Sequence, residues 1–119
     1  MAWSFDKHTP VYLQIAERIR NDIISGVYLP VSQIPSVRQL ALTAAVNPNT
    51  VQHALTVLEG EGLIFSESTS GRFVTSDTEL IEKARKNAAR EFVSTFLRYA
   101  QQLSFSRDEI INMIEEEWP

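Results

Sequence analysis

The stretch SVRQLALTAAVNPNTVQHALTVL, residues 36–58, contains two short helix patterns separated by a tight break. The first pattern opens with Ser36, which stands three residues before Gln39. This is the spacing of a capping box, in which each of the two side chains binds the backbone N–H of the other residue. The spacing predicts a helix from about Val37 to Ala44.

The second pattern in this stretch starts with Asn47 and Pro48. Asparagine is a preferred N-cap residue, and proline is favoured at the first helical position because an N–H there would have no partner within the helix. Apolar spacing continues through Leu58, and the pattern ends near Gly60 or Gly62. Two helices joined by so short a turn form a helix-turn-helix candidate.

The residues before this unit predict one more helix and a connector. Thr9 followed by Pro10 is typical of an N-cap and a first helical residue, and apolar residues then recur with helical spacing up to a stop at Gly26. The segment Val27–Pro35 contains two prolines and is predicted to be an irregular connector.

A small β-hairpin is predicted after the helix-turn-helix. Leu63–Phe65 and Arg72–Thr75 are β-prone and flank the polar run Ser66–Gly71. A hairpin in this place is a wing. The predicted fold is therefore mainly α with a small β-hairpin wing: a winged helix-turn-helix in residues 1–76, followed by two C-terminal helices.

The two C-terminal helices, in residues 77–119, are expected to form a dimerisation tail. Asp77 opens a long helix that reaches to about Gln102, and Ser106 with Glu109 forms a second capping box before the last helix. A long helix with an apolar stripe, attached to a small domain, has to bury that stripe, and a second copy of the chain offers a matching surface. The residues expected in the dimer interface are Ile81, Ala84, Ala88, Phe92, Phe96, Tyr99, Leu103, Ile110 and Ile114.

Composition excludes several kinds of site. The chain has no cysteine, which excludes disulfides and thiol chemistry, and two histidines, which are too few for most metal sites. We therefore expect no metal and no other cofactor. No apolar run approaches the ~20 residues of a membrane span, and the N-terminus lacks the layout of a signal peptide. A cytoplasmic protein without membrane contact is expected.

The charge balance is unusual for a nucleic-acid-binding protein, which normally carries a basic patch. The formal net charge is −4 at pH 7, and residues 1–76 hold five Lys and Arg against six acidic residues. Any affinity for DNA must then come from the placement of a few cations and from dimerisation.

The outer face of the second helix in the opening stretch has the composition of a surface that reads bases. Asn49, Gln52, His53 and Thr56 share this face, opposite a buried stripe formed by Val51, Ala54, Leu55 and Leu58. Amide side chains can pair with adenine in the major groove, and threonine can contact the methyl group of thymine. The alternative is an ordinary polar surface.

Five segments, in this order and spacing, resemble the GntR family of bacterial repressors: Pro10–Ile15, Gln33–Ala41, Val46–Val51, Leu58–Ile64 and Gly71–Val74. The start of the third helix and the short helical tail are most similar to the YtrA-type subgroup. The resemblance implies a winged helix-turn-helix and a tail that forms a dimer, without the large effector-binding domain of related subgroups. It also implies regulation of a neighbouring transporter operon.

The resemblance also implies roles for individual residues. Arg38 would contact phosphate and a neighbouring base edge, beside backbone amides at the capped start of its helix. The DNA-binding residues implied in this way are Ser36, Arg38, Asn47, Asn49, Thr50, Gln52, His53, Ser70, Gly71 and Arg72. For Arg38 and Arg72 the alternative is a surface salt bridge, and for His53 it is an ordinary position on the helix surface.

Three positions depart from the family pattern. The family usually has glycine where Ser32 stands, in the connector. Its wing tip usually reads Gly-x-Gly, where this chain has Thr69-Ser70-Gly71. With Thr69 in place of the first of these glycines, the sequence favours a close approach of the wing to the minor groove less strongly than the family pattern does. Pro48 replaces an arginine that many relatives carry, so one cation that reads bases is missing.

The sequence therefore predicts a homodimeric transcriptional regulator, a repressor that binds a pseudo-palindromic operator in double-stranded DNA. We expect no enzymatic activity, because no Gly-rich phosphate loop and no nucleophile with an adjacent base are present. One alternative is a winged-helix module that binds proteins without binding DNA. Another is a sensor whose tail aromatics bind a small apolar effector.

Overall fold

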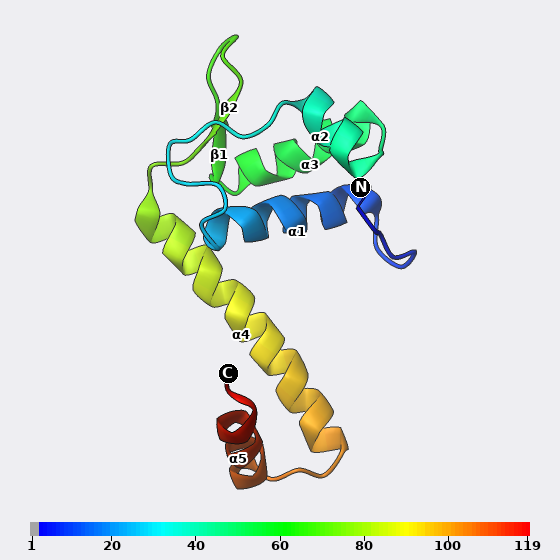
Figure 1. Ribbon diagram of the computed structural model, residues 1–119, viewed down its shortest axis with the longest axis vertical. Coiled ribbons are helices and arrows are strands. Elements are labelled where there is room, and N and C mark those ends of the chain that lie inside the picture. Colours follow the sequence, from blue (N-terminus) through cyan, green and yellow to red (C-terminus); the bar gives the residue numbers. More distant parts are fainter. Residues whose placement is uncertain (1–2) are drawn as a thin grey trace. The chain divides into compact units, whose positions relative to one another are not determined.

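Five helices and two strands form within residues 3–119, the part of the chain that the computed structural model describes. In chain order they are α1 (Val11–Ile24), α2 (Val37–Ala44), α3 (Pro48–Gly60), β1 (Ile64–Ser66), β2 (Arg72–Val74), α4 (Thr78–Gln102) and α5 (Arg107–Glu117) (Figure 1). The predicted fold class is confirmed. Contacts divide the chain into two units, one reaching to Arg85 and the other beginning at Lys86.

The predicted caps of α2 and α3 are confirmed. The Ser36 hydroxyl accepts from the Gln39 N–H at 3.1 Å, and the Gln39 side-chain oxygen accepts from the Ser36 N–H at 2.9 Å. At the start of α3, the side-chain oxygen of Asn47 accepts from the Asn49 N–H at 2.8 Å. Ala45 ends α2 in the left-handed conformation, which turns the chain directly into α3.

The start of α1 differs from the prediction by one residue. Pro10 is the N-cap and α1 begins at Val11, so the assignment of Thr9 as N-cap and Pro10 as first helical residue is wrong. The reason lies in the chain before the helix. The Gln14 amide donates to the Thr9 carbonyl at 2.7 Å, and the Asp6 carboxylate accepts from the Thr9 N–H at 3.2 Å.

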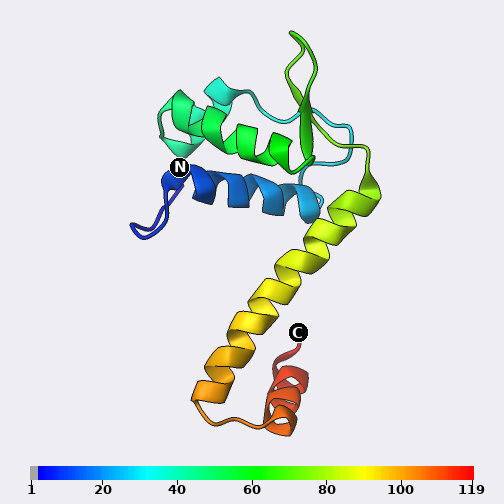
Figure 2. The same cartoon turned by 180° about the vertical axis from the view of Figure 1, so that it is seen from behind.

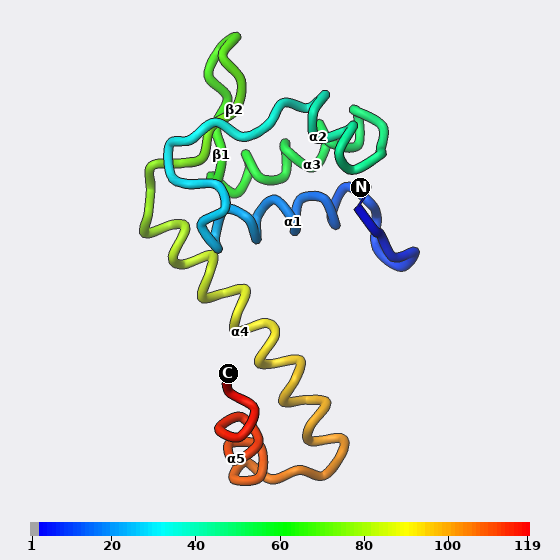
Figure 3. Tube along the Cα trace, viewed as in Figure 1, coloured from blue at the N-terminus to red at the C-terminus, as the bar shows by residue number. Residues whose placement is uncertain are grey.

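The connector between α1 and α2 is more ordered than predicted, because part of it pairs with the wing (Figure 3). The Val31 N–H donates to the Val74 carbonyl at 3.0 Å, and the Val74 N–H donates to the Ser32 carbonyl at 2.9 Å. Gln33 forms an isolated bridge with Phe73. The connector contains no helix or strand, as predicted, but the sequence did not indicate that part of it is hydrogen-bonded along β2.

The hairpin itself is close to the prediction. β1 and β2 pair antiparallel, with Phe65 opposite Phe73, and β1 starts and ends one residue later than predicted. β2 ends at Val74, one residue earlier than predicted.

The core of the first unit lies between α1, α2, α3 and the base of the hairpin. α1 and α3 lie side by side in both views (Figures 1 and 2). The largest fully buried side chains are Ile15, Ile19, Val51, Leu55, Leu58, Leu63 and Val74. Because this core holds one face of α3, the opposite face is presented to solvent on a rigid support.

The first turns of α4 belong to the first unit. Leu80, Ile81 and Ala84 pack against its core. The predicted boundary after residue 76 therefore separates the wing from α4 in sequence, whereas the contacts divide the chain within α4 itself. Among the described residues, no helix has both the length and the apolarity needed to cross a membrane.

Candidate nucleic-acid interface

The outer face of α3 carries a row of exposed polar side chains. Asn49, Gln52, His53 and Thr56 are exposed, and Thr50 is half-buried. Opposite them, the predicted stripe of Val51, Ala54, Leu55 and Leu58 is fully buried. The residues predicted to read bases on this helix thus share one accessible face.

The polar side chains on this face differ in whether they already form hydrogen bonds within the protein. The Thr56 hydroxyl donates to the Gln52 carbonyl at 2.9 Å, so it is bonded to its own helix. The side-chain amides of Asn49 and Gln52 have no hydrogen bond within residues 3–119, which leaves their donors and acceptors open. Asn47 differs from both, because its side-chain oxygen caps α3.

His53 is in contact with α1. Its imidazole stacks on the ring of Tyr12 with a centroid distance of 3.6 Å and an interplanar angle of 7°. Tyr12 is half-buried against the core, whereas His53 is exposed. The sequence indicated Tyr12 only as an extension of the buried stripe of α1, because spacing along one helix does not show which residue of another helix it meets.

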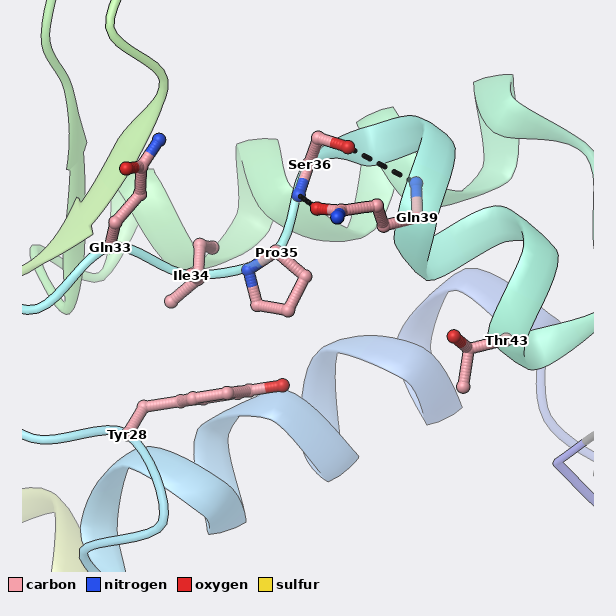
Figure 4. Close-up of a pocket in the computed structure, with 7 residues that line it drawn as sticks. All are labelled: Tyr28, Gln33, Ile34, Pro35, Ser36, Gln39 and Thr43. Atoms are coloured by element: carbon pink, nitrogen blue, oxygen red, sulfur yellow. Dashed lines mark hydrogen bonds between the residues drawn. The ribbon is translucent and has the colours of Figure 1, made fainter.

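The start of α2 offers backbone donors and one cation. The hydroxyl and the N–H of Ser36 are both used in the capping box (Figure 4). The N–H groups of Val37 and Arg38, in the first turn, have no acceptor in the described part of the chain, as is usual for a helix start. Arg38 is exposed and forms no ion pair with any described residue. This arrangement can hold a phosphate.

A polar hollow of about 600 Å³ lies beside this helix start, lined by Tyr28, Gln33, Ile34, Pro35, Ser36, Gln39 and Thr43 (Figure 4). Burial raises the pKa of the Tyr28 phenol, Asp22 raises it further, and Arg18 opposes both effects. The phenol therefore stays neutral and keeps its O–H as a donor at physiological pH.

Arg72, predicted to contact DNA, forms an ion pair with Glu59 at the base of the wing. Its Nε donates to Glu59 Oε1 at 2.6 Å, and the same oxygen accepts from the Ser66 hydroxyl at 3.0 Å. The hydrogen bond from Arg72 lowers the pKa of the Glu59 carboxyl; partial burial opposes this effect and Ser66 adds to it. Arg72 thus ties the hairpin to the end of α3, and most of its charge is balanced within the chain.

The tip of the wing is held by a residue that the sequence did not indicate for this role. Gln33 Nε2 donates to the Ser70 carbonyl at 2.6 Å. The next residue, Gly71, has a φ of +106°, and a Cβ atom added there would lie 2.6 Å from Gln33 Nε2. Glycine is required here for its backbone conformation. Gln33 is far from Ser70 in sequence, so no local pattern could have indicated this contact.

The residues predicted for the dimer interface differ in how exposed they are. Ile81 and Ala84 pack against the core of the first unit, and Ile110 is buried within the tail, which takes these three away from an exposed surface. Ala88 is half-buried. The exposed ones are Phe92 (69%), Phe96 (45%), Tyr99 (62%), Leu103 (55%) and Ile114 (44%).

Other apolar side chains of the tail are exposed as well. In residues 86–119 only Ala100 and Ile110 are buried, whereas Val93, Leu97, Met113 and Trp118 add to the exposed apolar surface. A cavity of about 420 Å³ opens between α4 and α5, and its walls include Leu97, Phe105 and Ile111. So large an apolar surface on a small unit is typical of an interaction site.

Known sequences similar to this chain are those of bacterial transcriptional regulators. The pattern of the bacterial regulatory proteins of the gntR family matches residues 11–74. The chain is 29% identical over 111 residues to the uncharacterized HTH-type transcriptional regulator YhcF of Bacillus subtilis (strain 168), covering 93% of this chain and 92% of that protein. It is 37% identical over 76 residues to the HTH-type transcriptional repressor YtrA of the same organism, covering 62% of this chain and 58% of that protein.

Solved structures show the same architecture. A GntR family transcriptional regulator from Listeria monocytogenes superposes with a TM-score of 0.89 at 30% identity, covering 94% of this chain and 98% of that one. YtrA from Sulfolobus acidocaldarius, a GntR-family transcription factor, gives 0.56 at 31% identity, with 98% and 94% covered. The DNA-binding domain of AraR in complex with operator ORX1 gives 0.58 at 30% identity, with 60% and 93% covered.

The family pattern spans more than half of the chain, and the relatives are transcriptional regulators, not enzymes. The winged helix-turn-helix described above is therefore the DNA-binding domain of a transcriptional regulator. The chain belongs to the GntR family of bacterial regulatory proteins, in its YtrA-like subgroup.

Proposed function

We propose that this regulator is a homodimeric repressor that binds a pseudo-palindromic operator in double-stranded DNA. The observation that carries the proposal is that α2 and α3, which pack on each other, expose groups free to bind: the open amides of Asn49 and Gln52, the Arg38 side chain and the free amides at the start of α2. In this proposal α3 lies in the major groove, the start of α2 holds a phosphate, and the wing contacts adjacent backbone.

The exposed apolar surface of the tail supports the homodimer. A unit with only two buried residues and exposed Phe92, Phe96 and Tyr99 gains stability by covering these rings. A second copy of the chain carries the same surface, and a two-fold dimer presents two α3 helices to two half-sites. Residues 77–119 thus supply dimerisation, while Leu80 and its neighbours also anchor α4 to the DNA-binding unit.

The repressor role is supported by the relatives, because YtrA of Bacillus subtilis is named a transcriptional repressor. Placement in the cytoplasm follows from the same role, since a regulator of transcription has to reach the chromosome.

Selection of bound fragments from random double-stranded DNA tests the proposal. We expect a symmetric site, with the half-sites about 10–10.5 base pairs apart or a multiple of this, as a two-fold dimer requires. Recovery of an asymmetric site would contradict the dimer, and recovery of no preferred sequence would contradict specific recognition.

A salt titration with the selected site separates this function from that of a winged-helix module that binds only proteins. Binding to DNA releases counterions, so the logarithm of the affinity should fall linearly with the logarithm of the salt concentration. A chain whose DNA affinity is absent, or is independent of salt, would belong to the other class.

A second candidate function is a response to a small apolar effector, favoured by the cavity of about 420 Å³ between α4 and α5. A compound that binds the folded protein there has to raise its melting temperature. A screen of small apolar carboxylates and aromatic compounds by thermal shift is the direct measurement. If no compound raises the melting temperature, the effector function is contradicted and dimerisation remains the proposed role of the exposed apolar surface of the tail.

A further inference from the structure

We propose that Tyr12 is a positioning residue for sequence reading: its ring holds the imidazole of His53 in one orientation on the outer face of α3. The inference rests on the proposed function, in which this face of α3 reads bases. It assigns to α1, a helix with no predicted DNA contact, a part in the specificity of the regulator.

The contact between the two rings is flat and close. Their centroids lie 3.6 Å apart and their planes differ by 7°. One side of the contact is anchored, because Tyr12 packs against the hydrophobic core in the first turn of α1. The other side, His53, is exposed and would otherwise be free to change rotamer. The anchored ring therefore restricts the mobile one.

A second contact, between α1 and the C-cap residue of α3, fixes the alignment of the two helices. Arg20 donates to both carboxylate oxygens of Glu61, from Nε at 2.8 Å and from Nη2 at 2.6 Å. Arg20 lies eight residues after Tyr12, and Glu61 lies eight residues after His53. The two helices thus run parallel and are joined at two points with matching spacing. The packing of α1 on α3 therefore holds the rings of Tyr12 and His53 together, so that the stack does not depend on the rotamer of one side chain alone.

The geometry leaves the recognition edge of His53 open. Stacking covers a face of the imidazole, whereas hydrogen bonds to bases are made by the ring nitrogens in the plane of the ring. No hydrogen bond to either ring nitrogen of His53 is present within residues 3–119. A side chain whose orientation is fixed before DNA arrives loses less freedom on binding, and it discriminates better between base edges.

The composition of α3 makes His53 important for the proposed reading of bases. The helix contains no lysine or arginine, so its direct readout has to come from amides, threonines and His53. An imidazole held in one orientation is the single aromatic donor or acceptor on this face. Loss of its orientation should therefore be visible as loss of preference at one base pair of each half-site.

Proton NMR of the free protein tests the stack itself. The chain has two histidines, and His8 serves as the internal reference because it is exposed and lies outside α3. We expect the ring C–H signals of His53 to lie upfield of those of His8, because of the ring current of Tyr12. The difference should disappear in Tyr12→Leu and remain in Tyr12→Phe. Coincident signals of the two histidines in the unmodified protein would overturn the proposal.

Selection from random DNA tests the consequence for reading. Tyr12→Leu and His53→Ala should lose preference at the same base pair of each half-site and keep the preference elsewhere, whereas Tyr12→Phe should retain all of it. The matched control is Trp3→Leu, which removes an aromatic ring that contacts Arg18 on α1 and is not stacked on α3. Circular dichroism melting confirms that each variant folds, and His53→Ala, at an exposed position, keeps the test valid if Tyr12→Leu is unstable.

Three results would contradict the inference. If Tyr12→Leu keeps the full preference, the ring does not position His53. If Tyr12→Phe behaves like Tyr12→Leu, the phenol hydroxyl acts instead, as a phosphate contact would. If the unmodified protein selects no DNA, the proposed function fails and this inference fails with it, a result distinct from a normal selection with no effect of Tyr12.

Discussion

Arg38 and Arg72 carry the same charge, and the structure places them in different surroundings. Arg72 is bonded to Glu59, whereas Arg38 is exposed beside free amides at the start of α2 and has no ion pair among the described residues. A cation with a partner in its own chain gains little by moving to a phosphate. Of the two, Arg38 is therefore the better candidate for a DNA contact.

Replacing Arg38 should accordingly weaken DNA binding with the fold intact. We expect Arg38→Ala to cost about 1–3 kcal/mol of operator binding and to reduce the salt slope by about one. The matched control is Arg107→Ala, which removes an exposed arginine of the tail. Fluorescence anisotropy at several salt concentrations measures both quantities. Equal losses in the two variants would show that only overall charge matters.

Glu59 makes stability depend on pH. Its folded-state pKa lies below its ordinary value of 4.5, chiefly because of the hydrogen bond from Arg72. The stability gained is therefore complete above pH 4.5 and is lost as the pH falls through the lowered pKa. Urea unfolding should show Glu59→Gln to be less stable than the unmodified protein at neutral pH, with the difference shrinking in acid.

The control for this experiment is Glu91→Gln, which removes an exposed carboxylate from α4. Its free energy of unfolding should follow that of the unmodified protein at every pH. A difference for Glu59→Gln that stays constant down to acid pH would show that the carboxylate is not stabilised by Arg72.

At the scale of elements, local patterns predicted α2 and α3 well, and non-local pairing was missed. The capping box of Ser36 and the Asn47–Pro48 start involve residues close together in sequence, so their spacing alone predicts where α2 and α3 begin. The pairing of Val31 with Val74 joins distant segments and depends on how α1 and α2 are packed. The same holds for the site: the outer face of α3 follows from periodicity, whereas the contacts of Gln33 and Tyr12 do not.

The wing offers a test of a single element. Gly71→Ala places a side chain at a φ of +106°, which should lower the free energy of unfolding of the wing by about 1–3 kcal/mol. Gly60→Ala is the control, because Gly60 is helical and no atom lies within 4 Å of an added Cβ. We expect the control to be neutral or slightly stabilising. Hydrogen exchange of the β1 and β2 amides measures the effect, and equal protection in both variants would contradict it.

At the scale of the whole molecule, the exposed apolar side chains of the tail support the proposed dimer, on which DNA binding should depend. The helices of the tail were predictable from their caps and stripe, yet the sequence could not separate apolar residues that serve the chain's own core from those left for a partner. Ile81 is an example, since it packs inside its own unit although it lies on the same stripe as Phe92.

A charge placed in the exposed stripe should therefore separate the dimer. We expect Phe96→Glu to give monomers in analytical ultracentrifugation and to weaken operator binding, because each monomer contacts a single half-site. Ser94→Glu adds the same charge on the opposite, polar side of α4, two residues away, and should remain dimeric. Dimers of Phe96→Glu with normal affinity would contradict the proposed role of the tail.

The absence of lysine and arginine from α3 has a consequence for the search along a chromosome. Affinity for random DNA comes almost entirely from neutralised phosphates, and this chain has few cations to neutralise them. The regulator should therefore spend little time on the very large excess of non-operator sequence. A larger share of its molecules should stay free in solution, so occupancy of its DNA site should follow the cellular concentration of the regulator directly, with little buffering by bulk DNA.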